Sequence, residues 1–223
     1  MARVEAANGV AQERTSRRDS NTFVAVMLIS AHTMQHVYSR GFLVILPFMM
    51  ESLGFGTLAA GVMDSIRRMS SGIASMGGGV LTDRFQHLRG HVLAGSIGLM
   101  GFGYLVIGLA PSYYLNLVAL GFAAAAGSIC HPPALGILSQ RFPERRGFFI
   151  SLHRSAGNIG ETIAPLAFGL LLAVVAWQAL LLGVFPIAFF VAASIWIFLK
   201  KVGGEKKITV AGEERSLKEQ LAL

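Results

Sequence analysis

Long apolar stretches separated by short polar segments dominate the chain between residues 23 and 200. Six of them reach the roughly 20 residues that a helix needs to cross the hydrocarbon core of a bilayer. Because the edge of an open sheet cannot be satisfied in lipid, we predict an all-α polytopic membrane protein with six transmembrane helices. The predicted spans are Phe23–Met50, Thr57–Leu81, Val92–Ala110, Tyr113–Gln140, Phe148–Val175 and Trp177–Leu199.

Polar residues recur at helical spacing in four of the six spans, whereas the third and sixth spans are apolar around their whole circumference. Helices that are apolar around their whole circumference typically face lipid. We therefore predict four striped helices around a polar interior, with the two plain helices outside. The stripes are His32, Gln35, His36, Ser39 and Arg40 in the first span; Asp64, Arg67, Arg68, Ser71 and Ser75 in the second; Asn116, Ser128 and His131 in the fourth; and Ser151, Arg154, Ser155, Asn158, Glu161 and Thr162 in the fifth.

Composition supports a membrane protein, because only 14% of the residues are charged and soluble domains carry about 25%. Polar tails are expected at residues 1–22 and 201–223, around a bundle at 23–200. The first tail lacks the apolar segment of a secretory signal peptide. The single cysteine, Cys130, excludes an intrachain disulfide.

The basic residues are distributed unevenly between the two predicted sides of the membrane. Fifteen of the 19 Lys and Arg residues fall in the tails and in the links after the second and fourth spans, and the opposite loops have none. Cytoplasmic loops carry such an excess. We therefore predict a plasma (inner) membrane protein with both termini in the cytoplasm, and we assign the net charge of +7 to topology rather than to nucleic-acid binding.

Residues match at an offset of 86 positions, which relates the first span to the fourth and the second to the fifth. These spans cross the membrane in opposite directions. The pattern predicts an inverted 3+3 repeat, an arrangement typical of transporters. The matched pairs are Pro47 with Pro133, Gly61 with Gly147, and Arg68 with Arg154.

Three charges interrupt the second span, at Asp64, Arg67 and Arg68. An Arg near the bilayer centre costs about 2.5–3.5 kcal/mol on insertion scales, and Arg68 lies roughly 16 Å along the helix from its start. Asp64 can pair with one arginine through helical spacing, which leaves the other without a local partner. Two interpretations stay open: a cation that binds an anion or acts in gating, or an ion pair across helices with Glu161.

The link GVLTDRFQHLR, residues 79–89, resembles the signature loop of the major facilitator superfamily. The matching residues are Gly79, Asp83, Arg84 and Arg89. The resemblance implies a cytoplasmic latch that controls the inward- to outward-facing change. Six spans with both ends inside are similar to the N-terminal half of that family's fold, and the second tail resembles the linker between halves.

A second run, HPPALGILSQRFPERRGFFISLHRSAGNIGETIAP, residues 131–165, resembles the fosmidomycin-resistance branch of the superfamily. Two positions depart from that pattern. His36 stands where the branch usually has Asp, and Leu117 stands where many proton antiporters have Arg. The matching residues are His131, Pro132, Arg145, Arg146, Gly147, His153, Gly157, Asn158, Gly160 and Pro165, together with His32, Tyr38, Gly41, Leu46 and Pro47 in the first span.

The resemblance implies a secondary active transporter that exports a small compound by proton coupling, present here as a six-helix half. Expected partners are membrane lipid, the substrate, protons, and a second half or a second copy. A non-transporting scaffold and an anion uptake transporter are alternatives. An enzyme is excluded because no paired catalytic constellation is visible, and no cofactor or metal site is expected.

Candidate residues for substrate binding or proton coupling share one property, a polar side chain within a predicted span. His36 is assigned to a cavity because Gln35, Ser39 and Arg40 surround it in sequence. His131 and His153 are interpreted as hydrogen-bonded helix contacts. The full candidate set is His32, His36, Arg40, Asp64, Arg67, Arg68, His131, Arg154, Asn158 and Glu161.

Overall fold

Helices make up nearly all of residues 21–202, the part of the chain that the computed structural model describes. The all-α prediction is therefore confirmed for this range, whereas most of the two predicted tails lies outside it. In chain order the elements are α2 (Asn21–Leu53), α3 (Thr57–Arg84), η1 (Gln86–Leu88), α4 (Arg89–Leu109), α5 (Tyr113–Ser128), α6 (His131–Arg141), η2 (Pro143–Arg145), α7 (Arg146–Leu172) and α8 (Trp177–Leu199).

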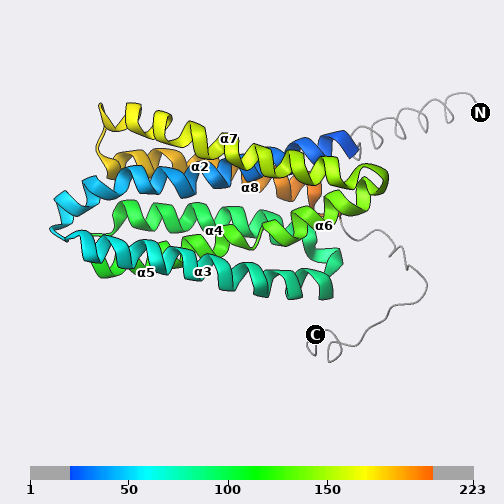
Figure 1. The fold of residues 1–223 in the computed structure, drawn as a ribbon, viewed down its shortest axis with the longest axis horizontal. Coiled ribbons are helices and arrows are strands. Elements are labelled where there is room, and N and C mark those ends of the chain that lie inside the picture. The colour runs from blue at the N-terminus through cyan, green and yellow to red at the C-terminus, as the bar shows by residue number, and fades with distance from the viewer. Residues whose placement is uncertain (1–20, 203–223) are drawn as a thin grey trace, which may run out of the picture.

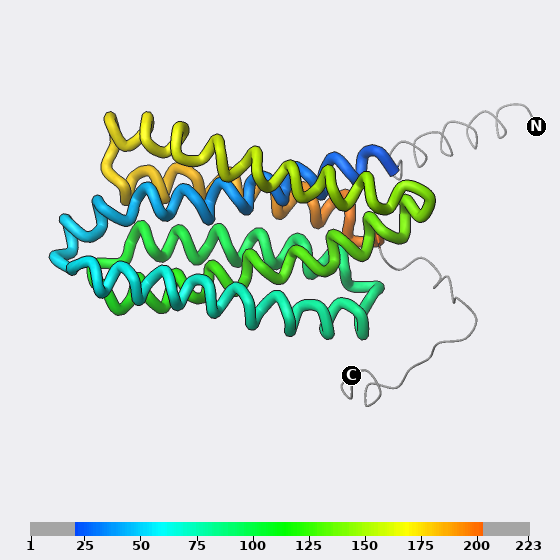
Figure 2. Tube along the Cα trace, in the orientation of Figure 1, coloured from blue at the N-terminus to red at the C-terminus, as the bar shows by residue number. Residues whose placement is uncertain are grey.

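The long helices lie side by side along one axis (Figure 1). α2 packs along α7, α3 packs along α5, and α4 lies between α5 and α8. Both ends of the described chain lie at the same end of the bundle as the η1 and η2 links (Figure 2). Short links make sequential long helices antiparallel.

The predicted fourth span is interrupted. α5 ends at Ser128 and α6 begins at His131, with Pro132 and Pro133 in its first turn. Proline lacks a backbone N–H and is tolerated at the start of a helix but not in its interior. The two prolines therefore restart the helix, and His131 lies at the break.

Three helical segments are long and apolar enough to cross a membrane by length and composition: Gln86–Leu109, Tyr113–Arg141 and Trp177–Leu199. The three other long helices, α2, α3 and α7, have 33, 28 and 27 residues. They exceed the roughly 20 residues that a span requires. Polar residues interrupt their apolar runs, because these helices carry the charged stripes.

The predicted position of α4 outside the bundle is wrong. The structure buries 56% of its apolar window, against 28% for α8. Small residues explain the difference, because they let two neighbours approach α4. A Cβ at Gly101 would lie 2.5 Å from Ala188 Cβ of α8, and one at Gly103 would lie 2.6 Å from Ala123 Cβ of α5.

The predicted polar interior is present only in part in the described bundle, where the stripe residues His32, Gln35, Asn116 and Ser128 are buried. Its buried core is mainly apolar and includes Phe42, Ile45, Ile97 and Leu120. Much of the polar stripe of α7 is exposed, as is Arg68 on α3. The physical reason is that six helices pack their apolar faces together, so the polar faces of α3 and α7 turn outward.

Candidate functional site

Asp64 holds both neighbouring arginines. Its Oδ1 accepts from Arg67 Nε at 2.9 Å and from Arg67 Nη2 at 2.5 Å, and its Oδ2 accepts from Arg68 Nε at 2.7 Å. The expectation that one arginine lacks a local partner is therefore wrong. One turn of helix places both guanidinium groups within reach of the same carboxylate, which has acceptor sites for both.

The two arginines differ in their surroundings. Arg67 is largely buried and also donates from Nη1 to Ser39 Oγ of α2 at 2.9 Å. Arg68 has 66% of its side chain exposed, and among residues 21–202 its Nη atoms have no hydrogen-bond partner. The two Nη groups of Arg68, called its outer fork below, are therefore available to a ligand. Arg67 instead joins α2 to α3.

Glu161 of α7 makes the second ion-pair cluster. Its Oε2 accepts from Arg40 Nη2 at 2.6 Å, and its Oε1 lies 3.0 Å from His36 Nδ1. The proposed pairing of Glu161 with an arginine of the second span is wrong, because α7 packs on α2 rather than on α3. Arg154 and Asn158, two turns and one turn earlier on α7, are exposed.

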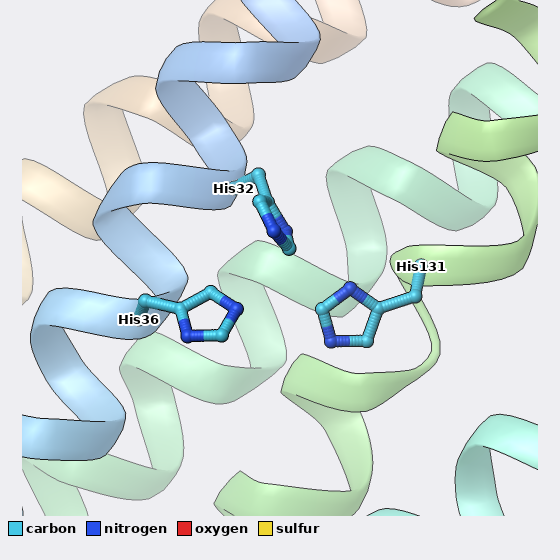
Figure 3. Close-up of side chains that lie close together, drawn as sticks. All are labelled: His32, His36 and His131. Atoms are coloured by element: carbon cyan, nitrogen blue, oxygen red, sulfur yellow. The ribbon is translucent and has the colours of Figure 1, made fainter. Parts of the chain in front are cut away.

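Four histidines from three helices meet beside this cluster. Figure 3 shows the rings of His32 and His36 on α2 turned toward His131 at the start of α6. The centroid of His32 lies 4.5 Å from that of His36 and 5.0 Å from that of His131. His153 of α7 stacks on His32 at 3.8 Å.

His153 is a site residue that sequence reasoning missed. It is buried, and within the described residues neither ring nitrogen has a hydrogen-bond partner. The expected hydrogen-bonded helix contact is therefore wrong for His153. His153 lies eight residues before Glu161, so both are on one side of α7. This helical spacing in the sequence could have grouped His153 with Glu161.

Close packing of α2 on α7 brings the histidines together. A Cβ at Gly157 would lie 2.7 Å from His32 Nε2 and 2.9 Å from His36 Nε2. One at Gly160 would collide with the carbonyl oxygen of Thr33. Thr33 Oγ1 also donates to the Ala156 carbonyl at 3.1 Å. Small residues on α7 therefore create the space that the imidazoles occupy.

The residues of the expected latch lie at the end of the bundle where α3 meets α4. Asp83 is 81% exposed and lies 3.8 Å from Nη2 of Arg89, whose side chain is only 5% exposed. Arg89 packs on α6, where a Cβ at Gly136 would lie 2.9 Å from its Cζ. Gly79 has open space beside it, and Arg84 is exposed.

Comparison with known proteins gives a relative and a family. The relative is a fujikurins efflux protein of Gibberella fujikuroi, 32% identical over 89 residues. The match covers 40% of this chain and 19% of that protein, so the matched segment spans about a fifth of the length of the curated relative. Residues 23–223 match the model of the Major Facilitator Superfamily. The chain therefore belongs to the Major Facilitator Superfamily, a family of transporters rather than of enzymes.

Proposed function

We propose that the chain forms a six-span half of a secondary transporter, built as an inverted 3+3 repeat. The helix packing supports this arrangement. Exchanging the first span with the fourth and the second with the fifth converts the α2–α7 pair into the α5–α3 pair. Both pairs pack extensively, and the same operation exchanges the third span with the sixth, so the packed α4–α8 pair is converted into itself.

The orientation in the membrane follows from the basic residues at the bundle ends. In the described range seven of them lie at the end that holds η1, η2 and the end of α8 (Figure 1). The positive-inside rule assigns this end to the cytoplasm of the plasma membrane. The residues are Arg84, Arg89, Arg141, Arg145, Arg146, Lys200 and Lys201.

Single cysteines test this orientation, in a background where buried Cys130 is replaced by Ala. An impermeant maleimide added outside intact cells is expected to label positions 52–56 and 111–112 and to miss positions 84–90. Labelling of positions 84–90 from outside would overturn the orientation, and detergent-permeabilised cells provide the positive control.

The transport function that the site supports best is proton-coupled export of a small anionic compound. The observation that carries it is the exposed fork of Arg68, held on a polar helix face by Asp64. A guanidinium offers paired donors that match a carboxylate or phosphonate. The relative named as an efflux protein favours export. The run at residues 131–165 favours the fosmidomycin-resistance-type branch and its drug-exporting antiporters.

Arg→Lys variants test the anion site directly. Fosmidomycin, a phosphonate, serves as the probe in equilibrium binding to the purified full chain with its partner half or second copy. Arg68→Lys and Arg154→Lys are expected to weaken binding at least about tenfold, because Lys keeps the charge and loses the fork. Arg146→Lys, in the link before α7, is the matched control. Parental affinity in both variants would reject the anion site.

A second half or a second copy completes the site in this proposal. The exposed charges on α3 and α7 would otherwise face lipid, where each carries an insertion cost. Alternating access also requires two bundles that move around a central site. Reconstitution at one chain per vesicle is expected to give no transport, and activity under that condition would contradict the proposal.

Anion uptake is the second candidate function, favoured by the bonds of Asp64. An anion at Arg68 competes with the Asp64 carboxylate, and a proton on Asp64 removes the competition. Protonation of Asp64 and anion binding therefore favour each other. Such coupling carries the proton and the anion across the membrane in the same direction.

Proteoliposomes with an imposed pH gradient separate the two functions. Accumulation of fosmidomycin in an acidic lumen supports exchange with protons and hence export. Accumulation in an alkaline lumen supports uptake together with protons. Transport that ignores the gradient overturns proton coupling, while the anion site is tested independently by the binding measurement.

A further inference from the structure

We propose that His32, His36 and His131 form a binding site for a divalent transition-metal ion. One ring nitrogen from each residue lies within 4.8 Å of those of the other two. The rings converge from α2 and from the start of α6 (Figure 3). The inference goes beyond the proposed function, since it depends neither on the substrate nor on the direction of transport.

The bond to Glu161 fixes which nitrogen of His36 is free. An ionised carboxylate only accepts hydrogen bonds, so His36 donates from Nδ1 to Glu161 Oε1 across the 3.0 Å contact. A neutral imidazole then carries its lone pair on Nε2. Metal-binding histidines commonly donate their other nitrogen to a carboxylate in this way, which orients the ring and raises its basicity.

The rings of His32 and His36 are positioned by close packing against α7. Nε2 of His32 and Nε2 of His36 both approach the position that a Cβ of Gly157 would occupy, so only glycine lets the two rings converge there. His32 is buried, and its Nδ1 has no hydrogen-bond partner in residues 21–202. A metal ion bound at Nε2 would give this buried ring one polar partner, with the proton on Nδ1.

Three imidazoles suit Zn²⁺ and its neighbours better than Mg²⁺ or Ca²⁺, which prefer oxygen ligands. Zinc–nitrogen bonds of about 2.0–2.1 Å in a tetrahedron place ligand nitrogens about 3.3 Å apart. Reaching this geometry requires the present separations, all within 4.8 Å, to shorten by at most about 1.5 Å through side-chain rotation. A three-histidine set leaves a fourth position for water or an anion, and Glu161 offsets part of the added charge.

Metal binding would join parts of the bundle that touch little otherwise. His32 and His36 lie on α2, whereas His131 lies at the break between α5 and α6, and these spans have few direct contacts. Since a ligand that binds only the folded state stabilises it, bound metal is expected to raise the melting temperature.

Zinc titration of the purified full chain without a polyhistidine tag tests the site. His87 and His91 are exposed and four residues apart, which is itself a spacing that binds metal on a helix. The His87→Ala/His91→Ala double variant is therefore the reference protein. It is expected to bind one Zn²⁺ per chain and to melt at a higher temperature with Zn²⁺ than without it.

Substitutions in this background identify the ligands. His36→Ala and His131→Ala are each expected to weaken Zn²⁺ binding by at least about tenfold and to abolish the thermal shift. Glu161→Gln is expected to weaken binding about tenfold, at the lower end of the effect of such outer-shell partners. Circular dichroism checks that each variant is helical. Unchanged Zn²⁺ affinity in both histidine variants, or no binding by the reference protein, rejects the site.

Copper gives a measurement that needs no site variant. The electron paramagnetic resonance spectrum of Cu²⁺ bound to the reference protein is expected to show coupling to three imidazole nitrogens. Coupling to fewer than two would contradict the proposal. Because neither measurement involves transport, failure of the metal site is distinguishable from failure of the proposed function.

Discussion

Two helix pairs in this bundle pack closely at glycines and differ in what lies between the helices. α4 and α8 meet through Gly101 against Ala188, with apolar neighbours. α2 and α7 meet through Gly157 and Gly160, and polar bonds cross between them from Thr33, His36 and Arg40. Small residues therefore allow close approach in both pairs.

The comparison separates packing from chemistry. Charged groups within a membrane are costly and tend to mark ion or substrate pathways, and they occur in the α2–α7 pair and beside it on α3. In the α4–α8 pair, the charged residues Arg89 and Lys200 lie at one end of the contact, and the contacts at Gly98 and Gly101 are apolar. We expect mutations in the apolar pair to alter stability alone, and those in the polar pair to alter transport as well.

Gly160→Ala is the test with the largest expected effect. Its new methyl group meets the backbone carbonyl of Thr33, which cannot rotate away. Overpacking of this kind costs about 1–3 kcal/mol, and α2 must separate from α7, so transport should fall as well. Thermal unfolding in detergent measures the loss. Gly169→Ala, on the same helix with open space beside it, should be neutral or slightly stabilising.

Gly101→Ala applies the same change to the apolar pair. The added Cβ would lie 2.5 Å from Ala188 Cβ, and we expect a loss of about 1–2 kcal/mol. Transport per folded molecule should match the parent. Gly95→Ala on α4, with nothing within 4 Å, is the control. A selective loss of transport in Gly101→Ala would break the comparison between the pairs.

Asp64→Asn is expected to abolish proton-coupled transport and to lower the free energy of unfolding by about 1–2 kcal/mol. It removes the acceptor charge for largely buried Arg67, and hydrogen bonds to charged groups contribute about 1.5–3 kcal/mol. Stability and transport are measured on the same preparation. Asp83→Asn, at an exposed carboxylate, should slow transport while leaving expression and stability nearly intact. Equal destabilisation by both would argue against a special role for Asp64.

Thr33→Val has the smallest expected effect. It removes the hydroxyl that donates to the Ala156 carbonyl of α7 and to the Ile29 carbonyl within α2, while keeping the shape of the side chain. Hydrogen bonds between membrane helices average about 0.6 kcal/mol. Ser96→Ala in α4 removes a bond to Leu93 within the same helix and should cost less. Reversal of this order would show that polar bonds add nothing to the α2–α7 contact.

Hydrophobic pattern predicted the helices well because it depends on local sequence. Trp177–Leu199 is the same as α8, and Thr57–Leu81 begins where α3 begins. The break in the fourth span at residues 129 and 130 was missed, since the apolar run continues through it. The predicted position of α4 outside the bundle was wrong because its glycines allow close contacts with two helices. The apolar pattern of α4 alone does not indicate which neighbours it contacts.

The sequence identified several polar residues of the candidate site but not which of them contact one another. Helical spacing identified His36, Arg40 and Glu161 as polar positions on two helices. Which of them meet depends on the rotation of α2 against α7, and long-range packing sets that rotation. The histidine cluster stayed hidden for the same reason, because its members lie up to 121 residues apart from His32 to His153.

The interruption between α5 and α6 bears on the hydration of the protein interior at membrane depth. Pro132 and Pro133 have no N–H, so the carbonyl oxygens of Ser128 and Ile129 lose their usual helical donors. In hydrocarbon an unsatisfied carbonyl costs several kcal/mol. We therefore expect water to reach these oxygens inside the protein, which would make the apolar barrier at the break thinner than the length of the helices suggests.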